Sequence, residues 1–221
     1  MRAKQDTIDP AAPIVIFGAD NRIGRLVSEQ LVSSGLQVRM VGSSADWASS
    51  EASGSAQVFL GNPAQDPARY GMEELFLLRV QGAASFATPL REAMRGAQAV
   101  VVCPESTAFP SPAWIVAGRS PRQQHALLPR NVAAALDPAA ARRVVLLSAI
   151  GAARALPRVP RLDENLLLAV TNAFGALDQF RVGEEAVRAA AGRAGCDAVI
   201  VRAKLHCYAA GPFGGPDEVL P

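Results

Sequence analysis

Lysine, tyrosine and long apolar runs are all scarce in this chain of 221 residues. Lysine occurs only at Lys4 and Lys204, and tyrosine only at Tyr70 and Tyr208. Most of the chain therefore lacks two side chains that enzymes commonly use to move protons. Apolar runs such as Val144 to Leu147 are broken by polar residues well before the ~18 residues of a membrane span, so we expect no spanning helix.

The chain also lacks a large excess of positive or negative residues. The chain has 22 basic and 20 acidic residues, which gives a formal net charge of only +2. The basic residues are almost all arginines, and they are scattered among the acids. A nucleic-acid-binding domain gathers its basic residues into a patch or stripe, so we expect no nucleic-acid partner.

Cysteine and histidine are too few and too dispersed for a metal site. Cys103, Cys196 and Cys207 are odd in number, and no two of them have metal-ligand spacing. His125 and His206 stand apart from any cluster of acids or cysteines, so each is interpreted as an ordinary, partly buried imidazole. The cysteine content indicates a reducing compartment; chloroplast, mitochondrion and cytoplasm all remain open.

The length of the chain favours one domain with one sizeable core. Half of the residues are hydrophobic, which is typical of a soluble globular protein. Residues 1–13 carry charges and two prolines but no apolar segment of the signal-peptide type, so we interpret them as an N-terminal arm. Such an arm is ordinarily mobile unless a partner holds it. Residues 14–221 form the predicted single domain.

The stretch from Ile14 to Val27 predicts a nucleotide site. Four apolar residues indicate a short buried strand, Gly18 begins a turn, and the apolar spacing that follows is helical. Such a turn aims the amides and the positive end of the helix at one point, which suits a phosphate or pyrophosphate. The dinucleotide motif is imperfect, because its middle glycine is replaced by Asn21. The expected cofactor-binding residues of the turn are Gly18, Ala19, Asp20, Asn21, Arg22, Ile23 and Gly24.

The end of the second predicted strand bears on the choice of cofactor. An acid at this point binds the ribose hydroxyls of NAD, whereas small polar or basic groups admit the phosphate of NADP. The strand Leu36 to Val41 is followed by Gly42-Ser43-Ser44, and Asp46 comes late. The sequence therefore favours NADP over NAD, with Ser43 at the site and Arg22 as the nearest candidate for the phosphate.

Strands and helices alternate along the rest of the chain, which predicts an α/β fold with a doubly wound, Rossmann-like parallel sheet of about six strands. Residues 67–98 are more than one short crossover needs, so part of this segment is expected to be an insertion. The further predicted strands are Gln57–Gly61, Ala99–Cys103, Arg143–Ser148 and Asp197–Arg202. The further predicted helices are Met72–Val80, Pro89–Arg95, Gln123–Leu136 with a bend or restart at Pro129, Asp163–Ala173 and Leu177–Ala191.

Four segments together carry a family resemblance. They are Val15–Val27, Val58–Asn62, Arg143–Gly151, and Gly183–Arg188 leading to Val199–Arg202. In these segments the chain resembles the atypical short-chain dehydrogenase/reductase group, in particular the NmrA-like and plastid NAD(P)-binding proteins. The resemblance covers nearly the whole chain and is more specific than the glycine turn alone. It implies that Asn62, in place of the family's aspartate, lies near the adenine, and that Ser148 matches the family's serine.

The catalytic pair of that family is missing. Its active members resemble one another in a Tyr-x-x-x-Lys pair on the helix after the fifth strand, where the lysine lowers the pKa of the tyrosine. In the matching region this chain has Phe180 and Arg181, and an arginine does not replace a phenol. The resemblance also implies a reduced C-terminal substrate part, because Ala203 to Pro221 leaves little room for it.

Three functional readings follow from the resemblance. The first is a non-catalytic accessory subunit or assembly factor of a larger photosynthetic or respiratory complex, with protein partners and a dinucleotide retained as a structural ligand. The alternative is an NADPH-dependent reductase or isomerase of the NmrA-like or isoflavone-reductase-like kind that works without the tyrosine. A redox sensor that binds the cofactor without turnover lies between them.

Overall fold

The computed structural model describes residues 8–51, 56–64, 75–81, 84–105, 120–150, 152 and 175–203. Within these residues, eight strands form one sheet in the order β5-β4-β3-β2-β1-β6-β7-β8. The strands are β1 (Ile14–Phe17), β2 (Val38–Gly42), β3 (Gln57–Leu60), β4 (Phe76–Gln81), β5 (Ala84–Pro89), β6 (Ala99–Val102), β7 (Arg143–Ala149) and β8 (Asp197–Ala203). The helices are α1 (Arg22–Ser33), α2 (Ala45–Glu51), α4 (Leu90–Ala93), the π-helix η1 (Arg122–Leu127), α6 (Leu128–Ala134) and α8 (Ala176–Ala194).

The six predicted strands form the parallel part of the sheet. Ile14 of β1 pairs with Val38 of β2 on one side and with Ala99 of β6 on the other, both in parallel. From β1 the chain adds β2 and β3 on one side of the sheet. It then adds β6, β7 and β8 on the other side of β1. This confirms the doubly wound α/β fold. The reversal lies between β1 and β6, and ligands of such sheets bind beside it, at the carboxyl ends of the strands.

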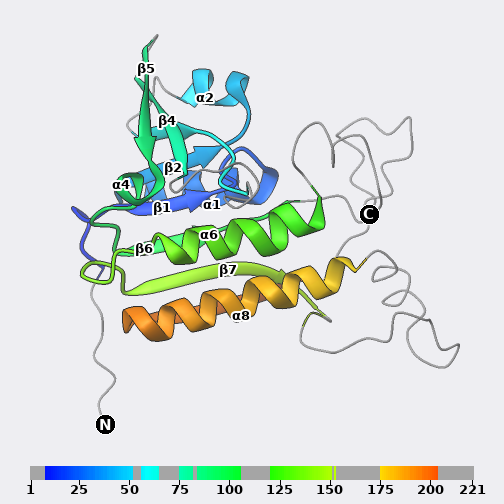
Figure 1. The fold of residues 1–221 in the computed structure, drawn as a ribbon. Coiled ribbons are helices and arrows are strands. Elements are labelled where there is room, and N and C mark those ends of the chain that lie inside the picture. Colours follow the sequence, from blue (N-terminus) through cyan, green and yellow to red (C-terminus); the bar gives the residue numbers. More distant parts are fainter. Residues whose placement is uncertain are drawn as a thin grey trace, which may run out of the picture.

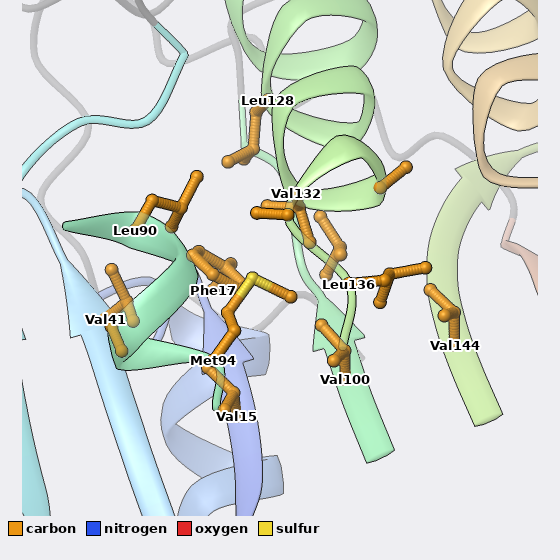
Figure 2. Close-up of a cluster of buried hydrophobic side chains, with 14 of the residues drawn as sticks. Val15, Phe17, Val41, Leu90, Met94, Val100, Leu128, Val132, Leu136 and Val144 are labelled. Carbon is orange, nitrogen blue, oxygen red and sulfur yellow. The ribbon is translucent and has the colours of Figure 1, made fainter. Parts of the chain in front are cut away.

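Both faces of the parallel strands are covered. Val15 and Phe17 of β1 belong to a core cluster with Leu128 and Val132 of α6, shown in Figure 2. The alternate residues of β1 belong to a second cluster on the other face, with Trp47 of α2. All four β1 residues are at most 4% exposed, which explains why the strand reads as one continuous apolar run. Figure 1 shows α6 and α8 side by side along β7.

An antiparallel hairpin extends the sheet beyond β3. β4 pairs with β3, and β5 pairs with β4, both antiparallel. The prediction of a helix over Met72–Val80 is therefore wrong for residues 76–80, and the sheet has two strands more than expected. The segment reads Phe-Leu-Leu-Arg-Val, an apolar run without helical or strand periodicity. Burial nevertheless alternates, with Leu77 1% exposed and its neighbours Phe76 and Leu78 50% and 42% exposed.

The remaining helix predictions have mixed outcomes. Within Pro89–Arg95 the structure forms the short α4. The expected restart at Pro129 is confirmed, because η1 gives way to α6 there and the proline occupies the first turn, where its missing N–H costs nothing. α8 confirms the helix over Leu177–Ala191 and ends at Gly195, whose φ is +68°. The helix predicted over Asp163–Ala173, the tail after Ala203 and residues 1–7 lie outside the described residues.

The N-terminal arm, where it is described, is held by the chain itself. Gln98, 6% exposed, accepts a 3.0 Å hydrogen bond from Asp9 N through its Oε1. Its Nε2 donates a 2.7 Å bond to the carbonyl of Ala12, and the Gln98 amide donates to the carbonyl of Pro13. Residues 8–13 thus need no partner to be ordered, and the expectation that a partner holds the arm stays a prediction for residues 1–7.

The described residues contain neither a candidate membrane span nor a candidate metal cluster. None of their helices has the length and apolar character that crossing a bilayer requires. No group of three or more histidine, cysteine, aspartate and glutamate side chains in this part of the chain could hold a metal ion.

Candidate functional site

The candidate site lies at the carboxyl edge of the parallel strands. Gly18 follows β1, Ser43 follows β2, Asn62 comes soon after β3 and Cys103 follows β6. Because these strands are parallel neighbours, their carboxyl ends meet at one edge. The residues that sequence analysis assigned to a cofactor therefore lie at this edge. They include Ser148, next to last in β7, although its hydroxyl is bonded to Glu184.

The two glycines of the turn are required by close packing. Gly18 has a φ of +75°, and a Cβ on it would stand 2.2 Å from the carbonyl oxygen of Cys103. A Cβ on Gly24 would stand 2.0 Å from the carbonyl oxygen of Gly18. Both distances are shorter than any real contact, so only glycine lets strand, turn and helix come this close. These are the roles of the first and third glycines of a dinucleotide-binding turn.

Asn21 replaces the middle glycine and folds back onto the protein. It is the N-cap of α1, and its Oδ1 accepts a 2.8 Å hydrogen bond from Gly24 N. Its Nδ2 donates a 2.6 Å bond to the carbonyl of Cys103. The side chain therefore takes one of the amides at the helix start and crosses from the turn to β6.

Asp20 carries its carboxylate to the end of β2. Its Oδ2 accepts hydrogen bonds of 2.8 Å from Ser43 N, 3.0 Å from Ser43 Oγ and 3.0 Å from Ser44 N. Sequence reasoning placed Asp20 in the turn but counted no acid at the end of β2. The signal that could have found it is an acid in the glycine turn together with the two serines that follow β2, whose donors need an acceptor.

The other turn residues hold the backbone or face solvent. The buried Ala19 donates its amide to the carbonyl of Val41, which ties the turn to β2. Arg22 and Ile23 open α1 with exposed side chains. Arg25, one turn further on, donates a 3.2 Å hydrogen bond from Nε to the carbonyl of Asp20. A positive side chain and the positive helix end thus lie at the same turn.

Asn62 shapes the loop after β3. Its Oδ1 accepts a 3.0 Å hydrogen bond from Ala64 N, which closes an Asx turn. Asn131 of α6 holds the same loop, because its Nδ2 donates a 2.6 Å bond to the carbonyl of Pro63. Sequence analysis missed Asn131.

Ser148 is bonded on the face of the sheet that α8 covers. It is 3% exposed, and its Oγ donates a 2.7 Å hydrogen bond to Glu184 Oε1. The Glu184 carboxylate, 1% exposed, also accepts bonds of 2.9 and 2.6 Å from Arg202 and one of 2.8 Å from Arg188. Burial raises the pKa of Glu184, but these hydrogen bonds outweigh burial and lower it to about 2. The carboxylate is therefore ionised and fully engaged, and Ser148 serves this cluster.

Phe180, in the region of the missing catalytic pair, is a packing residue. It is 7% exposed and stacks on His125 of η1, with ring centroids 3.6 Å apart. Burial lowers the pKa of His125 to about 3, so the imidazole is neutral. Gly183 allows this contact, because a Cβ on it would stand 2.0 Å from the carbonyl of His125. The expectation of an ordinary imidazole that is no metal ligand agrees with these contacts, but His125 is 4% exposed and so is buried, not partly buried as predicted.

Comparison with known proteins supports the fold and goes no further. No protein-family model and no curated protein matches the chain. The likeness is to solved structures. A putative NAD-dependent epimerase/dehydratase from Bacillus halodurans has a TM-score of 0.56 and 13% identity, with 87% of this chain and 70% of that chain covered. ChuY, an anaerobillin reductase from Escherichia coli O157:H7, has a TM-score of 0.53 and 18% identity, with 86% and 71% covered.

A third solved structure is a short-chain dehydrogenase/reductase superfamily protein from Agrobacterium tumefaciens with bound NAD. Its TM-score is 0.51 at 20% identity, with 86% of this chain and 48% of that chain covered, so this chain spans about half of its length. At such identities the shared property is the Rossmann-like fold of these proteins.

Proposed function

We propose that this chain binds a nicotinamide dinucleotide at the β1–α1 turn and does not carry out the Tyr–Lys proton transfer of the short-chain dehydrogenases. The observation that carries the proposal is the turn itself. Gly18 and Gly24 bring β1, α1 and β6 into contact distances that no other residue permits. The positive end of α1 and the Asp20 carboxylate then lie along one edge, which suits a diphosphate and an adjoining ribose.

One feature of the turn fits a dinucleotide less well. Asn21 takes the Gly24 amide and places Nδ2 2.8 Å from where a Gly18 Cβ would stand. A glycine at the middle position lets the backbone of the turn come close to the pyrophosphate, and Asn21 adds a side chain there. The side chain therefore competes with the ligand for space and for one donor, and we expect modest affinity.

Proton transfer lacks its usual residues. A bound nicotinamide supplies or accepts hydride, and the protein must then supply or remove a proton at the substrate. Phe180 is packed against His125, and Ser148 is bonded to a carboxylate that is held by arginines. Burial also raises the pKa of the Cys103 thiol, beside the turn, to about 11, so it stays protonated. Phe180, Ser148 and Cys103 therefore contribute to packing and hydrogen bonding within the fold.

The wider role that we propose is that of an accessory subunit or assembly factor in a larger complex, photosynthetic or respiratory, inside an organelle or the cytoplasm. In support, large apolar side chains are exposed on both outer parts of the sheet. Phe76 and Leu78 of β4 are 50% and 42% exposed, and Val199 and Val201 of β8 are 39% and 46% exposed. Native purification tests this role: co-purifying chains are expected, and a monodisperse monomer argues against it.

A reductase or isomerase that works without the tyrosine is the second candidate. ChuY, which shares the fold, is an anaerobillin reductase. This candidate predicts consumption of NADPH or NADH with a small carbonyl substrate. A cofactor-binding redox sensor predicts nucleotide binding without consumption.

Calorimetric titration with NADH and NADPH tests the proposed site. The wild-type chain is expected to bind at least one of them with a submillimolar Kd. Arg22→Glu places a negative side chain in the first turn of α1 and should weaken binding about tenfold, which is ~1.4 kcal/mol. Arg193→Glu, in the last turn of α8 at the opposite edge of the sheet, should leave binding unchanged. Absence of binding for both nucleotides at millimolar concentration would overturn the proposal.

A further inference from the structure

The carboxylate of Asp20 lies at the end of β2, although the residue itself belongs to the turn after β1. Oδ2 accepts hydrogen bonds from the amides of Ser43 and Ser44 and from the hydroxyl of Ser43, all between 2.8 and 3.0 Å. Three donors from one short segment fix both the position and the orientation of the carboxylate. Within the described parts of the chain, these are the hydrogen bonds recorded for that side chain, and none ends on Oδ1.

This position decides between the two nicotinamide cofactors in dinucleotide-binding folds. An acid at the end of the second strand accepts hydrogen bonds from the ribose hydroxyls of NAD. The same negative charge repels the additional phosphate that NADP carries on that ribose. The chain has no acid in Gly42-Ser43-Ser44 itself. The fold brings an acid there from another segment.

We infer that Asp20 selects NAD over NADP, with Oδ1 as the acceptor for the ribose hydroxyls. The inference rests on the proposed dinucleotide site and is opposite to the preference for NADP predicted from the sequence. One basic group, Arg25, contacts the Asp20 backbone, because its Nε donates a 3.2 Å hydrogen bond to the Asp20 carbonyl. Its charge lies beside the same residue and lessens the repulsion of a phosphate. NADP is nevertheless disfavoured, because the carboxylate already occupies the Ser43 and Ser44 donors that its phosphate would need.

Paired titrations of NADH and NADPH against wild type, Asp20→Asn and Asp46→Asn test the inference. Asp46 is an exposed acid in α2, a few residues after the same strand, and serves as the matched control. Wild type and Asp46→Asn are expected to bind NADH about tenfold more tightly than NADPH, whereas Asp20→Asn should bring the two affinities within about threefold of each other. Circular dichroism shows whether the variants fold.

If Asp20→Asn does not fold, wild-type protein titrated with 5′-AMP and with 2′,5′-ADP gives the same comparison, and 5′-AMP should bind more tightly. Equal binding of NADH and NADPH by wild type, or tighter NADPH binding, overturns the selection by Asp20 and leaves the dinucleotide site standing. An unchanged preference in a folded Asp20→Asn variant also overturns it. Absence of binding for both nucleotides overturns the site and the selection together.

Discussion

The side chain of Asn21 donates a 2.6 Å hydrogen bond to the carbonyl of Cys103 and so joins the turn after β1 to the end of β6. The same side chain caps α1 through a 2.8 Å bond from Gly24 N. Asn21 thus stabilises the fold from the position at which a dinucleotide-binding turn normally has its middle glycine. Stability and nucleotide affinity are therefore expected to respond in opposite directions to changes at this position.

Asn21→Gly should destabilise the protein and tighten nucleotide binding. Loss of the cap costs a few tenths to ~1 kcal/mol and loss of the bond to Cys103 another ~1 kcal/mol. The affinity for NADH should rise severalfold, because glycine releases the Gly24 amide and lets the backbone of the turn approach the pyrophosphate. Urea denaturation and calorimetry measure the two effects. Asn21→Ser, which keeps a capping oxygen but lacks the donor to Cys103, should lose about half as much stability; a glycine variant with unchanged or weaker NADH affinity contradicts the account.

Glu184→Gln should remove a pH-dependent part of the stability. Its pKa is lowered to about 2 in the folded protein from an ordinary value of 4.5. Ionised Glu184 therefore stabilises the fold above about pH 4.5, and this contribution is lost as the pH falls toward 2. At neutral pH the glutamine replaces the ionised acceptor of Ser148, Arg188 and Arg202 by a neutral one, and because the two arginines are partly exposed to solvent we expect a cost of ~1.5 kcal/mol.

The matched control for this change is Glu185→Gln, the next residue on α8, whose side chain is exposed. The free energy of unfolding at neutral pH, and its change between pH 5 and 2, should both stay close to those of wild type. Substitutions at exposed sites usually change the stability by about 0.5 kcal/mol or less. Urea midpoints across that pH range provide the measurement. The assignment fails if both variants show the same acid dependence as wild type.

Gly183→Ala and Gly192→Ala should change stability in opposite directions, although both glycines lie on α8. A Cβ on Gly183 would meet the carbonyl of His125 at 2.0 Å, and backbone cannot yield without moving η1. Overpacking of this kind costs ~1–3 kcal/mol. A Cβ on Gly192 meets nothing within 4 Å, so alanine there should stabilise by ~0.5–1 kcal/mol.

Thermal unfolding of the two glycine variants measures the difference. Equal effects at both positions would show that helix propensity, and not the contact between α8 and η1, governs Gly183.

Short-range patterns were sufficient for most of the fold. The apolar run of Ile14–Phe17 and the glycine after it predict a buried strand and a turn, because both depend on neighbouring residues alone. The hairpin of β4 and β5 was not predictable in this way. Its first strand has apolar residues on both faces, and only pairing with β3 determines which of them are buried.

In the candidate site, too, local features were predictable from the sequence and contacts between distant segments were not. The glycines and the N-cap asparagine were recognised as turn residues from their spacing. Asp20 at the end of β2, and Ser148 with Glu184 and Arg202, are relationships between segments far apart in the chain. Such juxtapositions arise from the parallel register of the strands and are not encoded in local spacing.

A crystal structure of the wild-type chain grown with saturating NADH tests the central claim most directly. The account predicts density for the dinucleotide at the carboxyl edge of β1 and β2, with the diphosphate at the first turn of α1 and the adenosine ribose within hydrogen-bond distance of the Asp20 carboxylate. Density for NADH elsewhere on the protein, or an empty turn with Asn21 still bonded to Cys103, would contradict it.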